Sequence, residues 1–229
     1  MYLKFVISIL VFFMFFSCKS PKTILKPDGN PLTAKANYQI NPLKSEPNDS
    51  TFVNLKDFSD GFAYDMKYAT SQNFLNSKVY ECGECFLRYK TVKALVAANN
   101  LFLKLGYKIK LFDCYRPLDV QKKMWKIVSN PDYVADPAKG SIHNRGGAVD
   151  ITLVDKSGNE LDMGTTFDFF GKEAAHDFLN LPNQVIKNRQ LLKSIMLEHN
   201  FKIFDSEWWH YNLSDAASFK ISNFKWDCK

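Results

Sequence analysis

Apolar residues recur at the 3.6-residue spacing of an α-helix in two segments of the chain. One segment covers residues 91–105 and is followed by Gly106, a residue that commonly ends helices. The other covers residues 184–199 and has a strongly amphipathic pattern. Pro117 is expected to open a further helix that continues to about Val128. The pattern therefore predicts three helices.

Strand-like patterns lie between and after these helices. They cover residues 108–114, 147–154, 201–204 and 208–213, and the second is rich in β-branched residues and bordered by two glycines. The order of helices and strands shows no regular βαβ alternation. We therefore expect an α+β fold, a single domain in which helices flank a mixed, mainly antiparallel sheet.

Composition and charge exclude several classes of protein. Hydrophobic residues make up 46% of the chain and charged residues 24%, as in ordinary globular proteins. The net charge of +6 comes from lysines spread along the chain, and a nucleic-acid-binding protein usually gathers such charge on one surface. No apolar stretch reaches the roughly 20 residues of a membrane-spanning helix, which excludes a multi-pass membrane protein.

The first residues have the pattern of an export signal. Lys4 precedes an apolar run over residues 5–16, which is short for a membrane span but suits a secretory signal. The run ends at Ser17-Cys18, which resembles a bacterial lipoprotein cleavage site although Phe15 stands where Leu is usual. We expect residues 1–18 to be a lipoprotein signal with Cys18 lipidated, and an ordinary secretory signal or an uncleaved anchor are the alternatives. The protein is then exported to the periplasm or cell envelope, and only this segment contacts the membrane.

Residues 19–50 are predicted to be a flexible tether, because a segment rich in proline and polar residues cannot bury enough apolar surface to offset its ordering entropy. The folded domain is expected to cover residues 51–229. The tether contains five of the prolines, namely Pro21, Pro27, Pro31, Pro42 and Pro47.

Export changes the interpretation of the cysteines. If Cys18 carries lipid, four remain, namely Cys82, Cys85, Cys114 and Cys228. An even number outside the cytoplasm favours disulfides, and four cysteines allow three pairings. A redox or zinc motif at Cys82-Gly-Glu-Cys85 is less favoured, since the sequence has no second such pair and no thioredoxin-like context.

Two short segments carry residues that suit metal chemistry. The first, residues 141–150, contains His143 and Asp150, and the second, residues 207–210, contains Glu207 and His210. Two histidines and one carboxylate can hold zinc and leave a fourth position for water. Asp150 stands in an otherwise apolar strand, where a carboxylate needs a cation or strong hydrogen bonds. Taken separately, each histidine is more typical of an ordinary hydrogen-bonded side chain.

These motifs resemble those of the zinc D-alanyl-D-alanine metallopeptidases, and in particular the D-alanyl-D-alanine dipeptidases of the vancomycin-resistance type. The resemblance covers residues 55–224. It rests on five ordered segments, at residues 66–74 (MKYATSQNF), 113–117 (DCYRP), 141–150 (SIHNRGGAVD), 163–169 (MGTTFDF) and 207–211 (EWWHY).

The resemblance implies a role for each of several residues. One zinc ion per chain would be bound by His143, Asp150 and His210, at the sheet. Glu207 would be the general base for the zinc-activated water, and Arg116 would stabilise the transition state. The substrate would contact Asp168 and Tyr68 near its free amino group, and also Ser141. A structural ion pair for Arg116, a loop cap for Asp168 and core packing for Tyr68 are the alternatives.

The resemblance implies hydrolysis of D-Ala-D-Ala to two D-alanines. Because the signal directs the protein out of the cytoplasm, we expect a role in peptidoglycan turnover or recycling rather than antibiotic resistance. One alternative is a D,D-carboxypeptidase that trims peptidoglycan stem peptides. A different class of protein, a lipid-anchored cell-wall binding module, would lack a ligand or the base, and all four residues are present.

Overall fold

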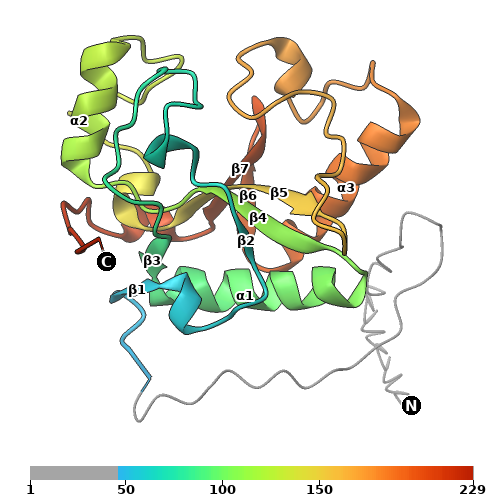
Figure 1. The fold of residues 1–229 in the computed structure, drawn as a ribbon, viewed down its shortest axis with the longest axis horizontal. Helices are drawn as coiled ribbons and strands as arrows, with labels where there is room; N and C mark the ends of the chain where they lie inside the picture. The colour runs from blue at the N-terminus through green and yellow to red at the C-terminus, as the bar shows by residue number, and fades with distance from the viewer. Residues whose placement is uncertain (1–45, 229) are drawn as a thin grey trace, which may run out of the picture.

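The structure, a computed structural model, describes residues 46–228 of the chain (Figure 1). The predicted signal, with Cys18, and most of the predicted tether lie outside the described residues. Within them, no helix combines the length and the apolar character that crossing a membrane requires.

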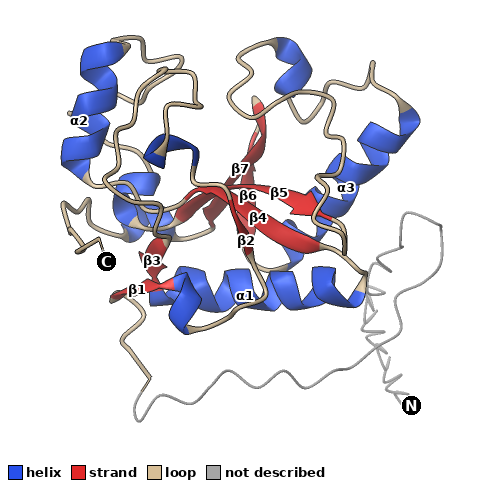
Figure 2. Cartoon of the chain, viewed as in Figure 1, coloured by secondary structure: helices blue, strands red, loops and turns tan. Residues whose placement is uncertain are grey.

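A five-stranded sheet forms the centre of the fold, with the strand order β2-β4-β5-β7-β6 (Figure 2). Strands β2 and β4 are parallel and all the other neighbours are antiparallel, as predicted. The strands are β2 (Ala63–Tyr64), β4 (Lys108–Asp113), β5 (Ala148–Val154), β6 (Phe201–Phe204) and β7 (Glu207–Leu213). A separate antiparallel pair is formed by β1 (Phe52–Asn54) and β3 (Phe86–Arg88).

Three α-helices accompany the sheet, namely α1 (Tyr89–Lys104), α2 (Leu118–Ile127) and α3 (Asn183–Glu198). Helices α1 and α3 contact each other and the sheet, whereas α2 lies apart from them (Figure 1). Five 3₁₀ turns occupy the connections, at Leu55–Asp57, Lys67–Ala69, His143–Arg145, Lys172–Ala174 and Ala216–Ser218.

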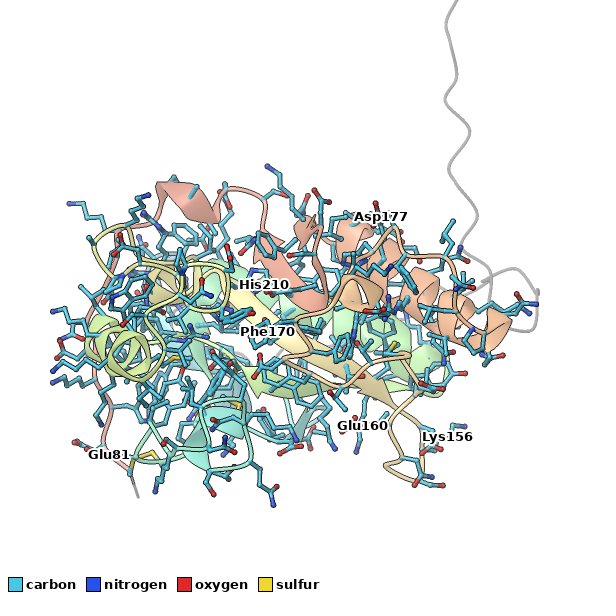
Figure 3. All side chains as sticks on the ribbon, turned by 90° about the horizontal axis from the view of Figure 1, so that it is seen from above. Glu81, Lys156, Glu160, Phe170, Asp177 and His210 are labelled. Atoms are coloured by element: carbon cyan, nitrogen blue, oxygen red, sulfur yellow. A yellow bond between two sulfur atoms is a disulfide. The ribbon has the colours of Figure 1, made fainter. Side chains whose placement is uncertain are left out.

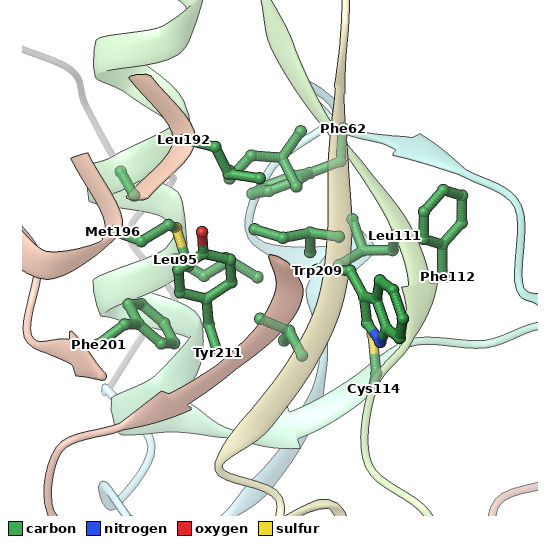
Figure 4. Close-up of a cluster of buried hydrophobic side chains, with 14 of the residues drawn as sticks. Phe62, Leu95, Leu111, Phe112, Cys114, Leu192, Met196, Phe201, Trp209 and Tyr211 are labelled. Atoms are coloured by element: carbon green, nitrogen blue, oxygen red, sulfur yellow. The ribbon is translucent and has the colours of Figure 1, made fainter. Parts of the chain in front are cut away.

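The core fills the space between the sheet and helices α1 and α3 (Figure 4). Successive side chains of a strand point to opposite faces, so alternate residues of a strand share an environment. On β5, Val149 and Ile151 belong to the core, while Asp150 between them faces the other side of the sheet. On β7, Tyr211 is in the core and is fully buried. The face opposite the helices is therefore the one that presents polar side chains.

The predicted elements agree with the structure to within one or two residues. Helix α1 begins at Tyr89 rather than at Thr91, because β3 passes directly into it and Tyr89 is already buried. Strands β1, β2 and β3 were not predicted. They have only two or three residues each, which is too short to show a period in the sequence.

Two disulfides connect the four cysteines of the described chain. Cys85 bonds to Cys114, and Cys82 bonds to Cys228. The predicted disulfides are thus present, and the close pair Cys82 and Cys85 does not bond to itself. The first disulfide joins the residue before β3 to the residue after β4, and the second attaches the C-terminal segment to the loop before β3.

Candidate active site

Three neighbouring strands align acidic and imidazole side chains in one row. Asp113 at the end of β4 is paired with Asp150 on β5, and Asp150 is paired with His210 on β7. His143 lies in the 3₁₀ turn that leads into β5. Between this turn and the strand, Gly146 adopts a left-handed conformation with φ of 74°, which a glycine adopts without steric cost. The glycines therefore bring His143 back over the strand that carries Asp150.

Three potential metal ligands converge at this row. His143 Nε2 lies 3.2 Å from His210 Nδ1. Asp150 Oδ1 lies 3.0 Å from His210 Nδ1, and Asp150 Oδ2 lies 3.4 Å from His143 Nε2. Two ligand atoms bound at about 2.0–2.1 Å to a tetrahedral ion are separated by about 3.3 Å. The observed separations thus match those around one tetrahedral ion.

The hydrogen bonds on the outer side of each ring determine which nitrogen faces inward without a proton. His143 Nδ1 donates to the carbonyl of Cys114 at 2.7 Å, and His210 Nε2 donates to Asn212 Oδ1 at 2.9 Å. With these protons outward, the inward nitrogens and the Asp150 carboxylate are three acceptors with no donor among them. The donor set therefore fits a divalent metal ion such as zinc.

Glu207 stands beside the ligands without joining them. Its carboxylate lies 3.9 Å from His210 Nδ1. Residues three apart on a regular strand face opposite sides, but a register shift between β6 and β7 interrupts the pairing at this point, and both side chains line the same cavity. Burial raises the pKa of Glu207, and the nearby charge of His210 lowers it by less. Its position and its raised pKa suit a group that exchanges protons with a neighbouring water.

Arg116 is held in place on both sides of its guanidinium. Asp113 accepts from Nη2 at 2.6 Å and from Nε at 3.2 Å, and Gln121 accepts from Nη1 at 2.9 Å. Asp113 is fully buried and Arg116 is only 7% exposed, yet Arg116 lines the cavity that contains the metal ligands. A fixed, permanently charged group is thereby presented to whatever occupies the cavity.

Asp168 has an unusual backbone and an unusual environment. Its φ of 57° is left-handed, which costs energy for a residue with a side chain. Tyr68 donates its hydroxyl to the carboxylate, at 3.0 and 3.1 Å from the two oxygens. Burial and the charge of Asp150 raise the pKa of Asp168 well above its ordinary value, and the Tyr68 hydrogen bond offsets them only in part. A cation placed next to this carboxylate would offset the unfavourable burial of its negative charge.

A single cavity of about 270 Å³ brings these groups together. Ser141 also lines it, and the Ser141 hydroxyl is buried with no hydrogen-bond partner in the described part of the chain. His210 is marked among the side chains in Figure 3. The cavity is lined by all of the predicted site residues of the described chain, which are Tyr68, Arg116, Ser141, His143, Asp150, Asp168, Glu207 and His210.

Comparison with known proteins assigns the chain to a family. The family model described as D-ala-D-ala dipeptidase matches residues 48–227. The chain belongs to this family of metallopeptidases. It is 34% identical over 164 residues to a D-alanyl-D-alanine dipeptidase of Escherichia coli, covering 72% of this chain and 85% of that protein. It is 31% identical over 188 residues to a D-alanyl-D-alanine dipeptidase of Enterococcus faecium, covering 72% of this chain and 92% of that protein.

The structure of this dipeptidase family member also contains supporting residues that the motif comparison did not single out. Asp113 connects Arg116 to Tyr80, whose hydroxyl donates to Asp113 at 2.7 Å. A signal for Asp113 was present, because an acidic residue ends an apolar strand three positions before an arginine. Asn212 could have been found too, since it lies two positions after His210 and so on the same face of a strand. No local pattern indicated Gln121.

Proposed function

We propose that the protein is a zinc-dependent dipeptidase that hydrolyses D-alanyl-D-alanine to two D-alanines. Family membership supports the reaction class. The observation that supports a free dipeptide as the substrate is the Asp168 carboxylate, which lines the same cavity as the metal ligands. Within the described part of the chain it forms no ion pair, and Tyr68 is its only side-chain donor. A free amino group of the substrate supplies the missing cation.

Different residues of the chain carry out metal binding and proton transfer in the proposed reaction. Zinc, held by His143, Asp150 and His210, would supply a Lewis acid and lower the pKa of a coordinated water to about 7. Glu207 takes a proton from the attacking water and delivers it to the amine of the leaving D-alanine. Its raised pKa, which is caused by burial, suits both transfers.

Arg116 acts on the charge that develops on the peptide carbonyl oxygen. Its guanidinium cannot lose its proton, and its two partners Asp113 and Gln121 keep it from reorienting. A donor fixed before the reaction stabilises negative charge without reorganising when the charge develops. Arg116 therefore lowers the barrier and contributes less to binding of the ground state.

Asp168 sets the preference between free and acylated substrates. The ammonium of a free dipeptide pairs with the half-buried carboxylate, whereas an N-acylated peptide offers it no cation. A hydrogen bond to a charged group contributes about 1.5–3 kcal/mol, or about ten- to a hundredfold in kcat/KM. This expectation separates the dipeptidase from the carboxypeptidase alternative, in which acylated stem peptides are the substrates.

An Asp168→Asn variant tests the proposal. For the zinc-loaded wild type we expect a kcat/KM about ten- to a hundredfold higher on D-Ala-D-Ala than on its N-acetyl form. The variant should lose most of this preference, because its neutral amide no longer attracts an ammonium. Asp177→Asn, at an exposed carboxylate marked in Figure 3, is the matched control and should behave as wild type. Equal cleavage of both substrates by the wild type would instead favour a carboxypeptidase.

We also propose that residues 1–18 export the protein, that Cys18 is lipidated, and that residues 19–50 connect it to the catalytic domain. In the cell envelope the enzyme would act in peptidoglycan turnover or recycling. The pairing of all four other cysteines in disulfides supports an oxidising compartment. Fractionation of cells that express the wild type or Cys18→Ala tests this proposal. The wild type should fractionate with membranes and the variant should not, and membrane association of both would refute lipidation at Cys18.

A further inference from the structure

Two aromatic side chains meet at the mouth of the active-site cavity. Tyr133, from the loop after α2, and Phe170, from the loop between β5 and α3, have ring centroids 4.4 Å apart. Both line the cavity, and they are 46% and 40% exposed. Phe170 and His210, which line the same cavity, are both marked in Figure 3. We call this contact the aromatic bridge, because it connects the loop after α2 with the loop between β5 and α3.

The exposure of the lining residues distinguishes the inside of the cavity from its mouth. Tyr68, Arg116 and Met124 are buried and close the cavity on the inside. Besides the aromatic bridge, the other exposed aromatic residue of the lining is Phe204. Its ring centroid lies 5.5 Å from that of His210, so it marks the metal side of the mouth.

The aromatic bridge belongs to the side of the mouth where Asp168 lies. Phe170 follows Asp168 by two residues. Its ring centroid lies 5.0 Å from that of Phe74, which is 6.2 Å from that of Tyr68, the hydroxyl donor to Asp168. A continuous series of aromatic contacts thus extends from the aromatic bridge to the carboxylate that is proposed to bind the substrate's amino group.

We propose that the aromatic bridge limits the substrate to two residues by occupying the space that a third, N-terminal residue would need. This inference rests on the proposed function, because the substrate's amino group must lie at Asp168. One further residue would extend the chain by about 3.5 Å beyond that point, away from the metal. Because the lining residues on the inside of the cavity are buried, the extension has to point toward the exposed mouth, where Tyr133 and Phe170 are in contact.

The chemistry of the aromatic bridge fits a size limit better than a binding role. Two rings in contact hold each other in place and present no charged group to an extended peptide. The aromatic bridge therefore excludes by shape, whereas Asp168 discriminates by charge. Loss of the aromatic bridge should therefore leave the charge preference of Asp168 intact.

Removing either ring tests the proposal. D-alanine release is measured from D-Ala-D-Ala and from Gly-D-Ala-D-Ala, with the zinc-loaded full-length protein. In Phe170→Ala and in Tyr133→Ala, we expect the ratio of kcat/KM for the tripeptide to that for the dipeptide to rise at least tenfold. Phe169→Ala is the matched control, because Phe169 is also 40% exposed, precedes Phe170 and does not line the cavity. Its ratio should equal that of the wild type.

Other outcomes distinguish a failure of the role proposed for the aromatic bridge from a failure of the proposed function. An unchanged ratio in both variants, in proteins that cleave D-Ala-D-Ala, overturns the role of the aromatic bridge and leaves the proposed function standing. A wild type that cleaves the tripeptide as well as the dipeptide also overturns this role, and it favours the carboxypeptidase alternative over the dipeptidase. A wild type that does not cleave D-Ala-D-Ala overturns both proposals. Phe170→Leu, which keeps an apolar side chain of shorter reach, replaces the alanine variant if that variant does not fold, and a ratio unchanged in Phe170→Leu also overturns the role.

Discussion

The ion pair between Asp113 and Arg116 offers a sharp test of how the site is supported. We consider Asp113→Asn, which preserves the shape of the side chain and removes its charge. Asp113 accepts hydrogen bonds from Tyr80, from the backbone of Cys114 and twice from Arg116. The amide can keep some of these, but it leaves the guanidinium without a counter-charge where Arg116 is only 7% exposed.

The expected loss of stability in Asp113→Asn follows from the burial of both members of the ion pair. Removing one partner of a buried ion pair costs about 3–5 kcal/mol of folding free energy, because the remaining charge has lost both water and partner. In a domain of 150–250 residues, that corresponds to a fall in the unfolding midpoint of about 6–20 °C. Activity should fall as well, by about 10- to 100-fold in kcat, because Arg116 loses the partner that orients it. His143 keeps its bond to the Cys114 carbonyl, so zinc should remain bound.

Thermal unfolding, zinc content and steady-state kinetics measure these three quantities on the same preparation. Asp119→Asn is the matched control, because its carboxylate is 47% exposed and pairs with Lys122 and Lys225 at the surface. Water screens exposed pairs of this kind, so the control should unfold at nearly the same temperature as the wild type. If Asp113→Asn unfolds as the control does, or keeps full activity, the support that we assign to this ion pair is wrong.

Three further changes test other parts of the structure. Glu207→Gln should lower kcat by about 100- to 10,000-fold with zinc still bound, because Glu207 transfers protons and is not a ligand; loss of zinc would contradict this division of roles. Replacing both Cys85 and Cys114 with Ala should lower the unfolding free energy by about 2–5 kcal/mol in chemical denaturation, and an unchanged value would refute a bracing role for the disulfide. Burial lowers the pKa of His176 from 6.5 to about 4, so the unfolded chain binds a proton first and stability declines as the pH falls from 6.5 to about 4. Since the ring is partly exposed, we expect the free energy of unfolding to fall by about 1–2 kcal/mol in the wild type and not in His176→Gln. Equal pH dependence of the two proteins would show that folding does not lower the pKa of His176.

The metal site could be predicted from sequence because its residues break local rules. Asp150 interrupts an apolar strand, and the glycines after His143 permit a turn that other residues would resist. The strand pairing that brings Asp150 opposite His210 is a long-range property, yet each strand was recognisable by its own pattern. These three candidate ligands could therefore be named from the sequence, and the structure places them where they could hold one metal ion.

Other features depend on contacts between distant segments and leave no local pattern. The cysteines indicated disulfides, but the pairing of Cys82 with Cys228 depends on where the C-terminal segment packs. Tyr133 stands in a loop without periodicity, and its contact with Phe170 arises only when two loops fold over the same cavity. The supporting hydrogen bonds of Gln121 likewise depend on tertiary packing.

The most direct test of the central claim is D-alanine release from D-Ala-D-Ala by the purified full-length protein before and after removal of metal. The zinc-loaded protein should cleave the dipeptide, a chelator should abolish cleavage, and added zinc should restore it. His210→Ala, which removes one of the three ligands, should neither retain zinc nor regain activity. Cleavage that survives both the chelator and the loss of this ligand would contradict a zinc-dependent dipeptidase.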